Sequence, residues 1–119
     1  MSWVVEFHPA FEPEFDALSR RAQTAIAAKA LLLEEFGPQL PRPHADTLAG
    51  SKHANMKELR CNADDGVWRV AFAFDPDRRA ILLVAGDKSG VSERRFYKRL
   101  IAKADERFDR HLEDRKGSP

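Results

Sequence analysis

Three strand-like segments follow one another between residues 56 and 86, and this run constrains the fold more than any other feature. The segments "MKELRCN" (56–62) and "VWRVAFAFD" (67–75) alternate in polarity, whereas "AILLVAG" (80–86) is apolar throughout. Alternation with a period of two is typical of a strand with one buried face, and a continuous apolar run is typical of a strand covered on both faces. The short connections between them contain Asp, Gly and Pro, as tight turns do. The sequence therefore predicts an antiparallel meander of three strands.

Before the meander, the sequence predicts one strand and a helical region. Residues 2–8, "SWVVEFH", are β-branched and aromatic, which favours a strand. Apolar residues then recur at helical spacing up to Gly37, which ends the helical region. Pro13 suits a first helical turn and Ser19 suits an N-cap, so the region is either two helices or one bent helix. Residues 37–47 contain three prolines and are predicted to form an irregular connection.

After the meander, residues 92–114 predict a long C-terminal helix. Apolar side chains recur there every fourth residue from Phe96 to Leu112, and Ser92 is a suitable N-cap. The resulting order is β-α-α-β-β-β-α, which predicts a compact α+β fold. The 119 residues contain no repeat and no low-complexity segment, so residues 1–119 are predicted to form one domain.

Composition limits the environment in which the chain works. Cys61 is the only cysteine, so an internal disulfide is excluded and a reducing compartment is favoured. The first residues carry several glutamates in place of a basic, apolar leader, and no apolar run approaches the roughly 20 residues of a membrane helix. We therefore expect a cytoplasmic protein that does not bind membranes. Residues 1–50 hold four Lys/Arg against seven Asp/Glu, whereas residues 51–119 hold 16 against 12, which is compatible with a polyanionic partner.

Two familiar kinds of site are not supported by the sequence. The stretch "AGDKSG" (85–90) lacks the spacing of a nucleotide-binding P-loop, because Asp87 separates Gly86 from Lys88 and would repel a phosphate. The four histidines show no metal-ligand spacing and are interpreted as surface or loop residues, so no metal or other cofactor is expected. The Cys61 thiol lies on the apolar side of its strand and is interpreted as a core residue.

A set of basic residues remains that the predicted strands would bring together. Arg60 and Arg69 face away from the apolar side of neighbouring strands, and Lys88 ends the next strand. Tyr97 and Lys98 follow at the start of the last helix. A phosphodiester backbone is a natural counter-anion for such a set. The alternative from the residues alone is a solvated sheet face that is neutralised by acidic residues, namely Glu58, Asp75 and Asp87.

Several of these segments together resemble the phage-derived toxins of the HigB and RelE type from type II toxin–antitoxin systems. The similar segments are "NMKELR", "WRVAFAFDP" and "AILLVAGDKSG", followed by "FYKRLI". The resemblance covers nearly the whole chain. It implies a curved antiparallel sheet with a helical pair on one face and a C-terminal helix. It also implies an endoribonuclease that cuts messenger RNA on the ribosome and is neutralised by an antitoxin, usually a helix-turn-helix protein.

The same resemblance assigns roles to individual residues. It implies that Arg69, Lys88 and Tyr97 are catalytic. The residues expected to bind RNA are Arg60, Lys57, His53 and Lys98. At position 58 the sequence departs from the pattern, because a carboxylate stands where relatives of the RelE type carry a cation. Two other hypotheses stay open: a non-catalytic module of the same fold that binds RNA or the antitoxin, and a small-molecule enzyme that holds a phosphate in the Gly86–Gly90 loop.

Overall fold

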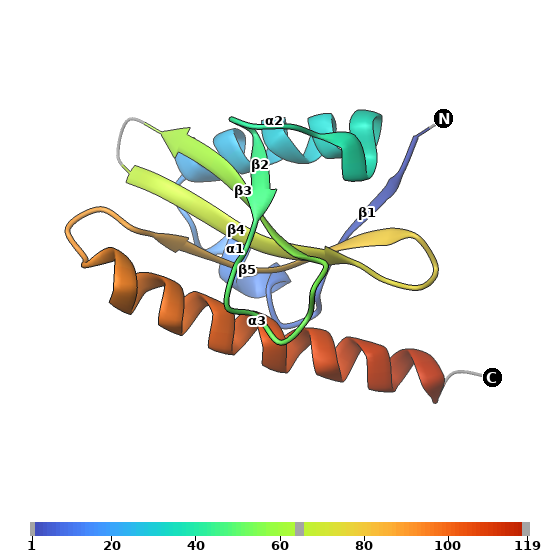
Figure 1. Ribbon diagram of the computed structural model, residues 1–119. Coiled ribbons are helices and arrows are strands. Elements are labelled where there is room, and N and C mark those ends of the chain that lie inside the picture. Colours follow the sequence, from blue (N-terminus) through green and yellow to red (C-terminus); the bar gives the residue numbers. More distant parts are fainter. Residues whose placement is uncertain (1, 64–65, 118–119) are drawn as a thin grey trace.

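A five-stranded sheet runs through the middle of the molecule, and helices cover both of its faces (Figure 1). This computed structural model describes residues 2–63 and 66–117, and its strand order is β1-β5-β4-β3-β2. The strands are β1 (Val4–Phe7), β2 (Ala45–Thr47), β3 (Met56–Ala63), β4 (Gly66–Phe74) and β5 (Arg79–Asp87). The helices are α1 (Glu12–Asp16), α2 (Arg20–Phe36), the 3-10 helix η1 (Gly37–Gln39) and α3 (Glu93–Lys116). The predicted α+β class is confirmed.

The predicted meander is present as β3, β4 and β5, which pair antiparallel in sequence order. Ala63 pairs with Gly66, so β3 and β4 form the expected hairpin, although the turn residues 64–65 lie outside the described residues. Ala71 pairs with Val84 but Phe72 pairs with Leu82, so β5 carries one extra residue at this point. The extra residue shifts the alternation of β5 and lets both of its faces stay apolar.

The two outer strands depart from the predictions. β1 pairs parallel with β5, so the sheet is mostly but not wholly antiparallel. Residues 45–47, predicted to be irregular, form the edge strand β2 along β3. Prolines prevent pairing only where their missing N–H is needed, and Pro43, the last of the three, precedes the strand. The prediction was wrong here because the effect of the three prolines was assumed to reach residues 45–47, which follow the last proline and each carry a backbone N–H group.

The helical region before the meander consists of two separate helices. Pro13 lies in the first turn of α1, and the Ser19 hydroxyl accepts a hydrogen bond from the Ala22 N–H (3.2 Å) as the N-cap of α2. α2 ends where Gly37 adopts a positive φ of 57°. The apolar residues of α2 pack with those of β3, β4 and β5 into a first core, whose fully buried members include Ile26, Leu33, Leu59, Cys61, Val70 and Leu82.

α3 covers the opposite face of the sheet and forms a second core. Ser92 caps α3 by accepting a hydrogen bond from the Arg95 N–H (3.3 Å), as predicted. The predicted apolar stripe, with one residue in every four, is buried against the sheet. Its members Phe96, Leu100, Ala104 and Phe108 pack with Ala71, Ala73, Ile81 and Leu83. In the part of the chain that the structure describes, no helix is both long and apolar enough to cross a membrane.

Candidate functional site

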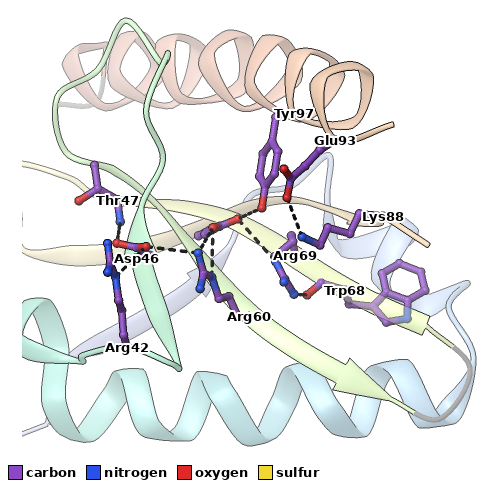
Figure 2. A network of polar contacts seen from close by, with 10 residues as sticks. Arg42, Asp46, Thr47, Arg60, Trp68, Arg69, Lys88, Glu93 and Tyr97 are labelled. Atoms are coloured by element: carbon purple, nitrogen blue, oxygen red, sulfur yellow. Dashed lines mark hydrogen bonds and ion pairs between the residues drawn. The ribbon is translucent and has the colours of Figure 1, made fainter. Parts of the chain in front are cut away.

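The first turns of α3 lie over a polar cluster at one end of the second core (Figure 2). Arg60 on β3 and Arg69 on β4 are direct cross-strand partners, and Glu58 lies two residues before Arg60. Two residues along a strand return to the same face, so Glu58, Arg60 and Arg69 all project toward α3. Tyr97 reaches the cluster from α3 itself. The predicted grouping of Arg60, Arg69 and Tyr97 is thus present in the structure.

The Glu58 carboxylate is the centre of this cluster. It accepts a hydrogen bond from the Tyr97 hydroxyl (2.8 Å) and forms an ion pair with Arg60 (3.3 Å). A second guanidinium group lies slightly further away, with the Nε atom of Arg69 3.8 Å from Oε1 of Glu58. Asp46 on β2 adds a second carboxylate, 3.2 Å from Arg60 Nη2. Glu58 is only 3% exposed, so its partners in this buried site are the two guanidinium groups and the Tyr97 hydroxyl.

Arg69 is buried but incompletely bonded. The residue is 8% exposed, and its Nη1 donates a hydrogen bond to the carbonyl of Trp68 (3.0 Å). Its Nε is buried and makes no hydrogen bond to any described residue. Arg60 is more open, with 36% of its side chain exposed. The more exposed Arg60 guanidinium, with the positive charge of Arg69 behind it, suits the binding of a further anion such as a phosphate.

Tyr97 and Lys88 form the outer part of the cluster. Lys88 Nζ lies 5.9 Å from the centre of the Tyr97 ring and forms an ion pair with Glu93 (3.1 Å), as Figure 2 shows. Burial, followed by the hydrogen bond to Glu58, raises the pKa of the Tyr97 phenol, and Arg69 opposes this only in part. Tyr97 therefore stays protonated at neutral pH and is suited to donate a hydrogen bond or to stack on a base.

The loop after β5 uses its own carboxylate to satisfy its backbone. Asp87 Oδ1 accepts hydrogen bonds from the N–H groups of Val67 (3.0 Å) and Ser89 (2.9 Å). Burial is the largest single influence on the pKa of Asp87 and raises it. The hydrogen bonds from Ser89 and Val67 together outweigh burial, so the pKa of Asp87 is lowered. A negative charge already occupies this turn, which argues against a phosphate in the Gly86–Gly90 loop.

Three of the residues predicted to bind RNA lie apart from the cluster or at its margin. Lys57 alternates with Glu58 and so projects toward the α2 face, where Leu59 and Cys61 are buried. The His53 ring bonds to Asp109 (2.8 Å) and packs against Phe108, well along α3 from Tyr97. Lys98 is exposed beside Tyr97.

Two further expectations concern residues outside the cluster. Of the four histidines interpreted as surface or loop residues, His8 lies in the loop after β1 but is only 4% exposed, and its Nδ1 accepts a hydrogen bond from the Ala10 N–H (3.0 Å). Cys61 is fully buried, as predicted, and burial raises the pKa of its thiol to about 12, which leaves it unreactive. Among the described residues, no group of three His, Cys, Asp or Glu side chains could hold a metal ion.

The sequence interpretation gave too little weight to the acidic members of the cluster. Glu58 was considered only as a departure from the family pattern and as one of three neutralising residues. Its position two residues before Arg60 was the signal that the two side chains share a face. Asp46 was missed because its segment was predicted to be irregular. Asp75, also expected to neutralise the cations, lies at the other end of the sheet, where it bonds to His111 (2.8 Å).

Comparisons with known proteins identify relatives of this chain. The chain is 43% identical over 109 residues to the Mycobacterium tuberculosis protein named "Putative toxin HigB3", which covers 92% of this chain and 93% of that protein. It is 44% identical over 98 residues to "Putative toxin HigB2" of the same organism, covering 82% of this chain but only 48% of HigB2, so it spans about half the length of that relative.

Solved structures share the fold. A double arginine-to-alanine mutant of the E. coli toxin RelE in the free state superposes with a TM-score of 0.61 at 12% identity, over 87% of this chain and 97% of that one. RelE in the archaeal RelE-RelB complex from Pyrococcus horikoshii OT3 gives a TM-score of 0.55 at 17% identity, over 76% and 100% of the two chains. The chain thus has a RelE-like fold. A family description, "Phage derived protein Gp49-like", matches residues 13–109, and the chain belongs to this family.

Proposed function

We propose that this protein is the toxin of a type II toxin–antitoxin system and cleaves messenger RNA on the ribosome. The observation that carries the proposal is the pair of guanidinium groups of Arg60 and Arg69 on neighbouring strands, beside the Tyr97 phenol, whose pKa is raised. Similarity to HigB3 over 93% of its length supports the toxin class. A protein that acts on translating ribosomes works in the cytoplasm.

The proposed reaction is an internal transfer within the RNA chain. The ribose 2′-oxygen forms a bond to the adjacent phosphorus, and the bond from phosphorus to the 5′-oxygen breaks. The products are a cyclic phosphate and a free 5′-hydroxyl. Arg69 and Arg60 stabilise the charge that develops on the phosphate, and Lys88 adds a third positive charge nearby. Such a step needs one proton acceptor and one proton donor but no metal ion.

The cluster offers a group for each proton. The Glu58 carboxylate is the candidate acceptor for the 2′-hydroxyl proton, and the Tyr97 phenol is the candidate donor to the leaving 5′-oxygen. The two groups are 2.8 Å apart, so a proton can return from Glu58 to Tyr97 after the reaction. Arg60 covers Glu58 in the free protein, and a bound phosphate that draws the Arg60 guanidinium away would uncover the carboxylate.

The proposed partners follow from the same family relationship. The Pyrococcus horikoshii structure holds RelE together with RelB, and we propose that an antitoxin likewise neutralises this protein. A helix-turn-helix protein is the expected antitoxin. The proposal therefore includes three partners: messenger RNA, the ribosome and this antitoxin.

Inducible expression in bacteria tests the proposal. The wild-type chain should arrest growth and cut messenger RNA, whereas Arg69→Ala should slow cleavage by a hundredfold or more, on the order of the loss seen when one donor to a transition-state oxyanion is removed. Arg115→Ala is the matched control, because Arg115 pairs with Asp77 at the other end of the molecule. Equal toxicity of Arg69→Ala and wild type at equal expression would show that the site assignment is wrong.

One observation favours a second candidate, a module that binds RNA without cutting it. The cations of the cluster are already neutralised by Glu58 and Asp46, as expected for a surface that binds reversibly. Growth arrest with intact transcripts would support this candidate. Glu58→Gln separates the two: it should relieve the growth arrest if the protein cleaves RNA and leave the arrest unchanged if the protein only binds RNA.

A further inference from the structure

β1 covers only the first part of β5 and leaves the rest of its edge without a strand. Val4–Phe7 pair with Arg79–Leu82, and the His8 N–H bonds to the Leu82 carbonyl (2.8 Å). β5 continues to Asp87, and no described strand pairs with residues 83–87 on the side away from β4. An uncovered edge of this kind is a template for an added strand.

A groove lies between this open edge and α3. Its volume is about 280 Å³, and its apolar lining includes Val84, Ala85, Val91, Phe96 and Leu100. Val91 at the mouth is 44% exposed although it is a large apolar residue. Gly86 forms part of the wall and approaches the Phe96 ring closely, since a Cβ at this position would lie 2.9 Å from it. The groove can therefore accept an apolar side chain.

The rim of the groove carries two cations and one carboxylate, Asp87, whose Oδ1 is turned to the N–H groups of Val67 and Ser89. Arg99 and Lys103 line it, both are exposed, and neither forms a hydrogen bond or ion pair with any residue that the structure describes. They are four residues apart on α3, so they lie on one side of the helix, separated by about 6 Å. Alternate residues of a strand are separated by about 6.6 Å, so acidic side chains at every second position match this spacing.

The next cation on the same side of α3 already makes the contact that this geometry calls for. Arg107 donates hydrogen bonds to the Leu83 carbonyl at the β5 edge (2.7 Å) and to the Glu14 carboxylate (2.6 and 2.8 Å). A carboxylate from outside α3 is thus bound beside the edge strand at Arg107. Arg99 and Lys103 present the same chemistry further along the open edge. The charge of Lys103 adds to that of Arg107 in lowering the pKa of Glu14, but no hydrogen bond or ion pair with a described residue occupies either side chain.

We propose that an extended acidic segment of a partner protein adds a strand to β5 at residues 83–87. Its backbone pairs with the open edge, its acidic side chains bind Arg99 and Lys103, and one apolar side chain enters the groove. The partner is the antitoxin, an identification that rests on the proposed function. The outer edge of β1 and the three-residue β2 are the competing edges, but the cavity between β5 and α3 is the one that combines an apolar floor with these unpaired cations.

A peptide binding assay on the full chain tests this proposal. The probe is a labelled octapeptide of alternating glutamate and valine, with a valine–lysine octapeptide and a uridine octanucleotide for comparison. Arg99→Glu/Lys103→Glu should weaken binding of the acidic peptide at least about tenfold, since like charges then face each other. Arg94→Glu/Lys116→Glu makes the same charge change at exposed positions of α3 outside the groove and should bind as wild type does.

Amide hydrogen exchange on the wild-type protein gives a second readout that needs no variant. Exchange at residues 83–87 should slow when the acidic peptide is bound. Equal peptide affinity in the two double variants, or unchanged exchange at these residues, would overturn the proposal. Uridine binding that is lost specifically in Arg99→Glu/Lys103→Glu would overturn it as well, by making RNA the occupant. Arg69→Ala should bind the peptide normally, so a failure here is distinct from a failure of the proposed nuclease.

Discussion

At the scale of single residues, Glu58 determines the state of the whole polar cluster. Its carboxylate is 3% exposed and is surrounded by two guanidinium groups and one phenol. Removal of a buried charge leaves its partners unpaired, which is more damaging than the loss of an exposed pair. The ion pair between Lys88 and Glu93, with Glu93 72% exposed, is of the weaker kind. Glu58 therefore lies between the cations of the cluster and adds to the effect of burial in raising the pKa of Tyr97.

The titration of Tyr97 measures this coupling directly, because the chain has a single tyrosine. In the wild type, the phenol should titrate above its usual value of 10.0, since burial and Glu58 both raise its pKa. Glu58→Gln removes the negative charge, so the pKa of Tyr97 should fall relative to wild type. The phenolate absorbance as a function of pH reports both values. An unchanged titration in Glu58→Gln would contradict this account.

The raised pKa of Tyr97 also determines how the stability of the protein changes with pH. A raised pKa in the folded state means that the folded protein retains the proton more tightly than the unfolded chain does. The stability contributed by Tyr97 is therefore complete below pH 10.0 and is lost as the pH rises through the folded-state pKa.

At the scale of elements, α3 has three consecutive parts that do different things. Its first turns cover the polar cluster through Tyr97, and its middle buries an apolar stripe on the sheet. Its last turns are fixed by polar contacts, among them the ion pair of Arg115 with Asp77 (2.7 Å) and the hydrogen bond between His111 and the buried Asp75 (2.8 Å). The position of Tyr97 thus depends on packing further along the helix.

At Gly86, β5 and the Phe96 side chain of α3 are so close that there is little room for a side chain on residue 86. Gly86→Ala would place a Cβ 2.9 Å from Phe96, and such overpacking should reduce the free energy of unfolding by about 1–3 kcal/mol. Gly117→Ala is the matched control, because its Cβ would meet atoms no closer than 3.7 Å, and it should change stability by less than about 0.5 kcal/mol. Denaturant unfolding measures both changes.

A second substitution tests the cause of that loss. If the Phe96 ring is the obstacle, Phe96→Leu should cost less in the Gly86→Ala background than in the wild type. Strictly additive losses would show that the two positions are not coupled in this way.

At the scale of the whole molecule, the sheet is buried on both faces, and its polar groups are concentrated at the two ends. One end holds the Glu58 cluster, and the other holds Asp75 and His111, whereas His8 is buried at the β1 edge beside Leu82. Burial, followed by the charge of Arg107, lowers the pKa of His8 below its usual value of 6.5. The folded protein therefore excludes a proton that the unfolded chain binds below that pH.

The stability of the protein should consequently decrease as the pH falls from 7.5 to 5.0. The unfolded chain gains a proton on His8 in this range while the folded chain resists it, so acidification favours unfolding. His8→Asn retains an acceptor for the Ala10 N–H but does not titrate, and its loss of stability over the same range should be smaller. Urea unfolding at the two pH values measures both losses. Equal losses in the two proteins would contradict a role for His8.

The sequence by itself determined the features that depend on near neighbours. The meander, the caps at Ser19 and Ser92 and the ends of both long helices follow from periodicity and turn chemistry within a few residues. The shared face of Arg60 and Arg69 follows from the pleat of two hairpin-linked strands. The family resemblance also came from the order of such short segments.

Only the tertiary structure decided which distant segments meet. The parallel pairing of β1 with β5, the edge strand β2 and the burial of His8 join residues far apart in the chain. Tyr97 and Glu58 are 39 positions apart, yet burial and the hydrogen bond between them together raise the pKa of Tyr97. Such contacts depend on how the helices pack on the sheet, because burial and the geometry of facing charges are properties of the folded chain and not of local sequence.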